Sequence, residues 1–142
     1  MPRYMIQVRA TAMSEAGEFP DDPTLVPRMM AFHDEMAKAG VLVDGAGQMP
    51  SSQGFRVEYD AKGRASVTDG PFAETKELIA GYTLIDVASR EQALAWARRF
   101  PAPFPGLACC IEVRPLMGGI DLPPEDAERL IREQLAAIRR GG

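Results

Sequence analysis

The sequence predicts an α+β fold, with one domain over residues 1–117 that has the element order βαββαβ and an added hairpin. A helical extension follows over residues 118–142. Short segments in which apolar and polar residues alternate, the pattern of a strand with one buried face, recur through the domain, and two segments with helical apolar spacing lie between them. The chain has 142 residues, 46% hydrophobic and 25% charged, which is enough for one sizeable core.

In the first third of the domain the sequence predicts a strand, a loop and a helix. Residues 4–9 alternate and form the expected strand, and residues 11–23 are polar and interrupted by Gly and Pro, as in a long loop. Apolar side chains recur at intervals of three and four over residues 24–39, which predicts an amphipathic helix. Gly40 follows at the position where glycine commonly ends a helix.

A second strand and the added hairpin come next. The strand begins at residues 41–43, and residues 44–47 are expected to end it or to bulge it. Residues 55–59 and 64–68 alternate on either side of a turn at residues 60–63, which predicts the hairpin.

The second half of the domain predicts a strand, a helix and a last strand. The strand is expected over residues 82–87 and the helix over residues 90–100. Ser89 is a good N-cap for this helix, and Gln92 stands three residues on, as in a capping box. The last core strand is expected over residues 110–116.

The C-terminal extension begins at Gly118 and Gly119 and is helix-prone over residues 125–140. Its apolar stripe consists of Ala127, Leu130, Ile131, Gln134, Leu135 and Ile138. Because an isolated helix of this length is marginal in water, we expect it to dock on its own domain or on a neighbouring chain.

A charged stretch between the hairpin and the following strand is the candidate site. Asp69 precedes the Gly-Pro turn, where its carboxylate can accept backbone hydrogen bonds in an Asx-turn, and Phe72 is expected to plug the core beneath the loop. Glu74 and Lys76 follow within the same segment. Either these charges form a turn cap and a solvated patch, or they are binding groups held on a loop.

The string TDGPFAETKELIAGYTLIDV, residues 68–87, resembles the DGPF-type proteins of the YCII-related family, and the flanking pattern covers approximately residues 4–116. The resemblance implies a ferredoxin-like domain that pairs into a homodimer, a dimeric α/β barrel with a shared sheet and a cleft. It also implies a link to extracytoplasmic-function sigma factors, beside which some members are encoded. Right-handed crossovers would place both helices on one face of the sheet, so the residues independently favour a second subunit on the other face.

His33 lies on the flank of the apolar stripe of the first helix. It either packs its ring at the boundary of the core or serves as a general acid or base, because histidine is the side chain suited to proton transfer near neutral pH. Some YCII-related proteins have a His–Asp pair in their cleft. A gap-free comparison puts that histidine at Met29 or Met30 of this chain, about one turn before His33, so we do not transfer the pair.

Composition and motifs exclude several classes of function. A net charge of −4 and a pI near 5.0 argue against direct nucleic-acid binding. No apolar run approaches the ~20 residues of a membrane span and no signal-peptide core begins the chain, so a cytoplasmic protein without membrane contact is expected.

Metal and cofactor sites also lack their motifs. Cys109 and Cys110 are adjacent, so we expect a buried packing thiol rather than a redox pair, and with one histidine the chain lacks the spaced ligands of a zinc site. The glycines of residues 44–47 do not have the spacing of a nucleotide-binding motif. The sequence therefore predicts no metal and no cofactor.

Two classes of function follow from these residues. The first is a small-molecule-binding domain, or an acid/base enzyme, with a cleft near the charged stretch at residues 69–77, which we call the DGPF loop. Its candidate acid/base groups are Asp69, Glu74 and His33, and its candidate ligand contacts are Arg9, Lys76 and Tyr82.

The alternative is a non-catalytic regulatory or protein-interaction module associated with a sigma-factor system, for which the C-terminal helix is the candidate contact. A dimer whose charged loop merely stabilises the interface is a third possibility.

Overall fold

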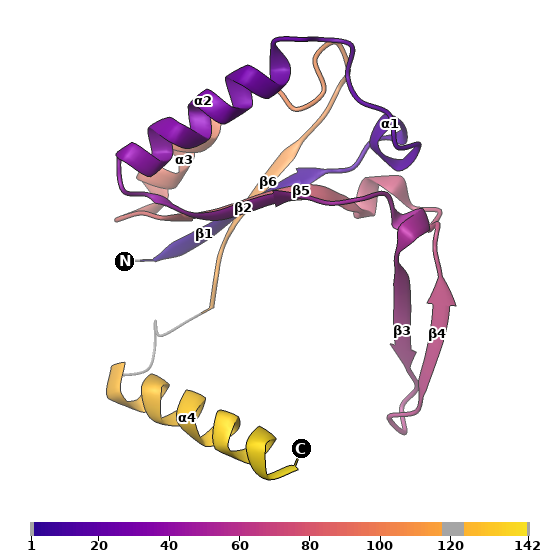
Figure 1. The fold of residues 1–142 in the computed structure, drawn as a ribbon, viewed down its shortest axis with the longest axis vertical. Coiled ribbons are helices and arrows are strands. Elements are labelled where there is room, and N and C mark those ends of the chain that lie inside the picture. Colours follow the sequence, from indigo (N-terminus) through magenta and orange to yellow (C-terminus); the bar gives the residue numbers. More distant parts are fainter. Residues whose placement is uncertain (1, 118–123, 142) are drawn as a thin grey trace.

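The computed structural model describes residues 2–117 and 124–141 and is built on one antiparallel sheet (Figure 1). Its strands are β1 (Arg3–Arg9), β2 (Leu42–Gly47), β5 (Ile79–Asp86) and β6 (Ile111–Pro115), in the order β2-β5-β1-β6. The predicted α+β class is confirmed.

Two helices, α2 (Leu25–Lys38) and α3 (Arg90–Arg99), cover one face of this sheet (Figure 1). The core lies between them and the strands, because alternate residues of β1 and β5 point to this face, and Ile6 and Ile85 among them are fully buried. The buried cluster consists of Ile6, Phe32, Met36, Ile85, Val87 and Ala93.

The helix ends follow the predicted signals. Gly40 has a φ of +76° after α2, a conformation that glycine adopts without steric cost. The Ser89 hydroxyl accepts a hydrogen bond from the Gln92 backbone N–H at 3.2 Å, as an N-cap does. The Gln92 side chain accepts from Ala88 N at 3.0 Å, one residue outside the expected partner.

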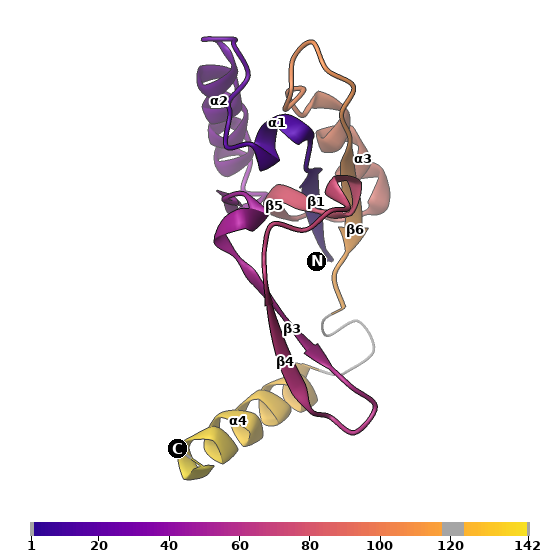
Figure 2. The same ribbon diagram turned by 90° about the vertical axis from the view of Figure 1, so that its right-hand side faces the viewer.

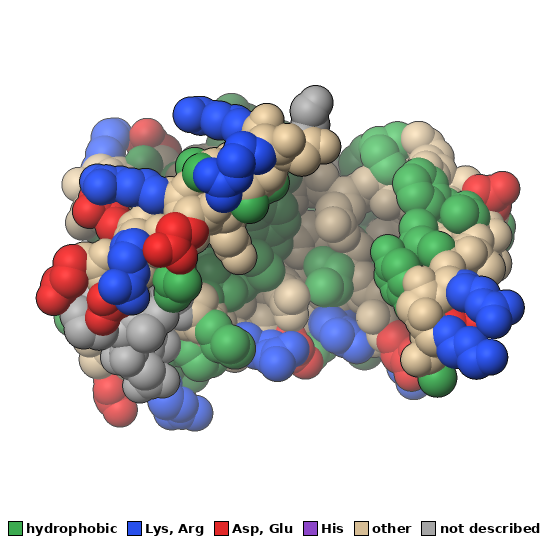
Figure 3. All heavy atoms as spheres, turned by 90° about the horizontal axis from the view of Figure 1, so that it is seen from below, with side chains coloured by type: hydrophobic (Ala, Val, Ile, Leu, Met, Phe, Trp, Pro, Cys, Tyr) green, Lys and Arg blue, Asp and Glu red, His purple; other side chains and the backbone are tan. Residues whose placement is uncertain are grey.

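The sheet has a second face, turned away from α2 and α3, which we call the open face. By strand alternation its members include Met5, Gln7, Tyr82, Leu84 and Arg114. Seen from below, this side of the molecule is hollowed between two projecting walls (Figure 3).

One of these walls is the hairpin of β3 (Phe55–Tyr59) and β4 (Ala65–Asp69), which pair only with each other and extend away from the sheet (Figure 2). One side of this ribbon is apolar and exposed. Its larger side chains are Phe55, Val57, Tyr59 and Val67, between 39% and 71% exposed.

The other wall is α4 (Pro124–Gly141), close to the predicted helix. The larger apolar side chains of its stripe, Leu130, Ile131, Leu135 and Ile138, are between 43% and 68% exposed, so α4 does not bury this stripe on its own domain. The predicted start of the extension at Gly118 and Gly119 lies outside the described residues. No helix within residues 2–117 and 124–141 is long and apolar enough to span a membrane.

Some boundaries differ from the prediction. The expected loop over residues 11–23 contains a one-turn helix, α1 (Ala12–Glu15), because Thr11 and Ser14 form a capping box. The strand β2 is bulged between Leu42 and Asp44, as one alternative had it, and then continues to Gly47.

The later segments show two further differences. β5 begins at Ile79, three residues earlier than expected, and two short 3-10 turns, η1 (Ser51–Gln53) and η2 (Thr75–Glu77), lie in the loops. Cys109 and Cys110 precede β6 and both are exposed, so the expectation of a buried packing thiol is wrong.

Candidate functional site

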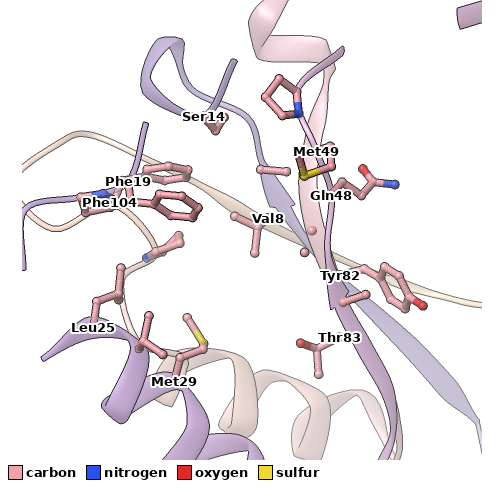
Figure 4. A pocket seen from close by; sticks show the side chains of 18 of the residues that line it. Val8, Ser14, Phe19, Leu25, Met29, Gln48, Met49, Tyr82, Thr83 and Phe104 are labelled. Carbon is pink, nitrogen blue, oxygen red and sulfur yellow. The ribbon is translucent and has the colours of Figure 1, made fainter. Parts of the chain in front are cut away.

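A cavity of about 480 Å³ lies on the helix-covered side of the domain, between α2, the segments that follow α1 and α3, and the ends of β1, β2 and β5. We call it the helix-side pocket. Apolar side chains from all of these segments converge on it (Figure 4). They include Val8, Phe19, Leu25, Met29, Met49 and Phe104.

One hydrogen-bonded polar pair, His33 and Thr83, lies in the wall of the helix-side pocket. His33 Nδ1 is 2.8 Å from the Met29 carbonyl oxygen, and His33 Nε2 is 2.8 Å from Thr83 Oγ1. A carbonyl can only accept, so Nδ1 carries the proton, and in the neutral ring Nε2 accepts from the Thr83 hydroxyl. The Met29 carbonyl therefore fixes the tautomer of the neutral His33 ring.

Packing also holds the His33 ring in place. The ring contacts Phe32 and Phe100 edge-on, with centroids 6.2 Å and 6.0 Å away. Thr83 is 2% exposed, because it lies on the core-facing side of the central strand β5. A preorganised imidazole beside an apolar cavity can bind a polar group or transfer a proton.

The mouth of the helix-side pocket is apolar as well. Phe19 is 88% exposed, and Met30 and Met49 are each 68% exposed, although all three line the cavity. Large apolar side chains gathered around an opening are typical of a binding surface.

A second cavity, of about 540 Å³, lies beside the DGPF loop, lined by residues that include Glu15, Phe55, Phe72 and Glu77. Three distant segments are joined here through Ser51. Its backbone N–H donates to Glu15 Oε1 at 3.0 Å, its hydroxyl donates to Glu15 Oε2, and the same hydroxyl accepts from Phe72 N at 3.1 Å.

The DGPF loop is packed tightly against this junction. Gly70 N donates to Gly54 O at 3.0 Å, and a Cβ atom on Gly70 would lie 1.8 Å from the Ser51 carbonyl oxygen. Only glycine fits there without a backbone shift.

Two local predictions for this loop need correction. Phe72 is half-buried and lies outside the core cluster. Its ring stacks under the Arg56 guanidinium, with Arg56 Cζ 3.8 Å from the Phe72 ring centroid, because the base of the hairpin places Arg56 over the loop. The predicted Asx-turn at Asp69 is not formed among the described residues, since the nearby Gly70 and Phe72 N–H groups donate to Gly54 and Ser51 instead.

The predicted site residues fall in three places. His33 lines the helix-side pocket, whereas Asp69, Glu74 and Lys76 are exposed on the DGPF loop and line neither pocket. Arg9 donates to the Lys76 backbone carbonyl and lies 3.9 Å from Glu112.

Tyr82 borders the helix-side pocket, but its ring points away from the cavity (Figure 4). Its hydroxyl donates to Asp44 Oδ2 at 2.8 Å on the open face, and this hydrogen bond raises the pKa of Tyr82. Within residues 2–117 and 124–141 no group of three or more His, Cys, Asp or Glu side chains could hold a metal ion.

Sequence reasoning missed Thr83, Glu15 and Ser51. Thr83 had a detectable signal, because it is a hydroxyl residue on the apolar side of an alternating strand, where a hydrogen-bond partner is required. Glu15 and Ser51 had none, since their contact joins segments 36 residues apart.

Comparison with known proteins finds a matching family and a related sequence. A family model described as the YCII-related domain matches residues 3–117. An uncharacterized protein of Rhizobium meliloti (strain 1021) is 36% identical over 96 residues, which cover 68% of this chain and 76% of that protein. The family match spans both sheets, whereas α4 lies beyond it.

Proposed function

The chain belongs to the YCII-related family, and we propose that it is a small-molecule-binding domain whose ligand occupies the helix-side pocket. The observation that carries the proposal is an apolar cavity of about 480 Å³ with the preorganised polar pair His33–Thr83 in its wall. Ligand sites commonly combine apolar walls with a few placed polar groups. His33 is the proposed acid or base if the ligand is also turned over.

The DGPF loop is a proposed second contact region. Asp69 and Glu74 are the proposed acid/base or ligand-orienting carboxylates, and Lys76 and Arg9 the proposed anion contacts, because this loop supplies Phe72 and its flank supplies Glu77 to the second cavity. Tyr82 is proposed to contact ligand only from the open face. Alanine at Asp69 and Glu74 should preserve folding and weaken binding; unchanged binding would remove both from the site.

A thermal-shift screen of a metabolite library with the full chain tests the main proposal. A ligand that binds the native state should raise the unfolding midpoint by mass action. The shift should disappear in Met29→Trp, which fills the pocket, and persist in the matched control Ala31→Trp on the exposed side of the same helix. No shift across the library, or one insensitive to Met29→Trp, would contradict the proposal.

We further propose a ferredoxin-like topology and a homodimer formed through the open face. The strand order β2-β5-β1-β6 with α2 and α3 on one face supports this topology, and the apolar side of the β3–β4 ribbon supports a covering subunit. A two-stranded ribbon is marginal in water by itself.

Light scattering on size-exclusion fractions tests the homodimer. Leu84→Asp on the open face should produce monomers, whereas Leu94→Asp on the exposed side of α3 should not. A wild-type monomer at high concentration would refute the assembly.

A protein-interaction module, in the setting of a sigma-factor system, is the second candidate function. The exposed apolar stripe of α4 favours it, because such a surface is typical of a contact site. Pull-downs with the full chain and with a chain ending at residue 117 test this role; equal recovery of partners would exclude α4 from it.

A further inference from the structure

We infer that the helix-side pocket takes an uncharged, largely apolar molecule that carries one hydrogen-bond donor, a hydroxyl or N–H group, and presents it to Thr83 Oγ1. The inference rests on the proposed function, since it assigns a ligand class to the same pocket. It follows from the charges of the lining and from the direction of one hydrogen bond.

The lining disfavours a charged ligand. Among the side chains that border the helix-side pocket, Glu18 is the one carrying a full charge at neutral pH, and it is exposed. An anion would meet no Lys or Arg side chain in this lining. A cation that moved inward would lose its hydration and gain only apolar contacts with Val8, Leu25 and Met29. Burying an unpaired charge is far more costly than burying a neutral group of the same size.

The direction of the His33–Thr83 hydrogen bond selects a donor. His33 Nδ1 donates to the Met29 carbonyl, which leaves Nε2 of the neutral ring as an acceptor. The Thr83 hydroxyl proton is therefore engaged by Nε2, and Oγ1 offers only lone pairs to a third group. A ligand hydroxyl or N–H can donate to Thr83 Oγ1 and so extend this chain of hydrogen bonds. An ether or carbonyl oxygen would instead bring its lone pairs against those of Oγ1, which is unfavourable.

The pair lies between the pocket and the backbone of β2. A Cβ atom on Gly45 would lie 3.6 Å from Thr83 Oγ1 and 3.7 Å from His33 Nε2. These are ordinary van der Waals distances, so the backbone of β2 at Gly45 packs beside the pair, while His33 and Thr83 themselves line the helix-side pocket. Thr83 is 2% exposed and lines the helix-side pocket, so a donor that reaches Oγ1 has to come from inside the cavity.

Three probes of one scaffold test the ligand class on the full chain: 2-naphthol, 2-methoxynaphthalene and 2-naphthoate. They share two fused rings and differ as donor, acceptor and anion. Dissociation constants come from NMR titration of the backbone amides. We expect 2-naphthol to bind about two- to tenfold more tightly than 2-methoxynaphthalene, the ratio that one net hydrogen bond supplies, and 2-naphthoate to bind most weakly.

A variant assigns the preference to Thr83. Thr83→Val keeps the shape and removes the hydroxyl, so the naphthol-to-ether ratio should fall to about one while binding of the ether persists. Thr68→Val on the exposed hairpin is the matched control and should keep the wild-type ratio. A ratio that survives in Thr83→Val would overturn the assignment.

The wild-type titration separates the two levels of inference. Equal binding of 2-naphthol and 2-methoxynaphthalene, or tightest binding of 2-naphthoate, overturns the ligand class and leaves the pocket as a site. Binding of none of the probes overturns the proposed function together with the ligand class. Because it uses only the wild-type protein, this comparison tests the ligand class even if Thr83→Val fails to fold.

Discussion

Gly70→Ala should destabilise the domain because the DGPF loop has no room for a side chain. The added Cβ would lie 1.8 Å from the Ser51 carbonyl oxygen and 2.7 Å from its carbonyl carbon, so one of the two backbones has to move. The displaced segment holds the Gly54 N to Ser51 O and Gly70 N to Gly54 O hydrogen bonds, each 3.0 Å long.

The expected cost follows from these contacts. Overpacking costs about 1–3 kcal/mol, and each hydrogen bond lost adds about 0.5–1.5 kcal/mol, so Gly70→Ala should lower the free energy of unfolding by about 2–4 kcal/mol. Urea denaturation followed by circular dichroism measures this change as a lower midpoint at an unchanged slope.

Gly54→Ala is the matched control, because its Cβ would meet the same Ser51 oxygen at an ordinary 3.6 Å. Gly54 has a φ of −113°, which any residue adopts, so this variant should stay within about 0.5 kcal/mol of wild type. Equal midpoints for the two variants would refute the close contact at Gly70.

Three further predictions concern the core, the open face and the C-terminal helix. Phe32→Ala should lower the free energy of unfolding in urea by about 3–5 kcal/mol, because Phe32 is 6% exposed. Val26 is 63% exposed, so Val26→Ala should change that free energy little, and similar losses for the two variants would contradict the core assignment. The hydrogen bond to Asp44 raises the pKa of Tyr82, so its stabilisation is complete below the ordinary tyrosine pKa of about 10 and is lost as pH rises through the higher folded value. In wild type the urea midpoint should therefore fall as pH rises through the alkaline range, and in Tyr82→Phe this part of the fall should be missing. The same pH dependence in both proteins would show that Tyr82 does not cause it. A chain ending at residue 117 should keep the wild-type thermal midpoint at low protein concentration, since the α4 stripe is exposed; a large decrease would show that α4 docks on its own domain.

Local patterns predicted most of the fold. The alternation of β1, the apolar stripe of α2 and the Ser89 cap of α3 are encoded within a few residues each, so periodicity and capping rules suffice for them. Phe72 failed this kind of reasoning, because its burial depends on how Arg56 and the hairpin base cover it.

The candidate site was predictable only in part. His33 could be named from sequence, since it borders an apolar stripe, but its partner Thr83 is 50 residues away and the pairing depends on which strand lies under α2. The charges of Asp69 and Glu74 drew attention to the DGPF loop, while the helix-side pocket is lined by residues that read individually as ordinary core or loop positions.

The β3–β4 ribbon should open as a unit separate from the four-stranded sheet. Within residues 2–117 and 124–141 it exchanges no ladder hydrogen bonds with the four-stranded sheet, and the Gly70 to Gly54 hydrogen bond closes its base beside Ser51. Its amides should therefore exchange with solvent through local openings that leave the sheet intact, whereas those of β1 and β5, flanked by partners on both sides, should require global unfolding. The rate of deuterium uptake by the ribbon amides would then report association, because it should fall when another surface covers the apolar side of the ribbon.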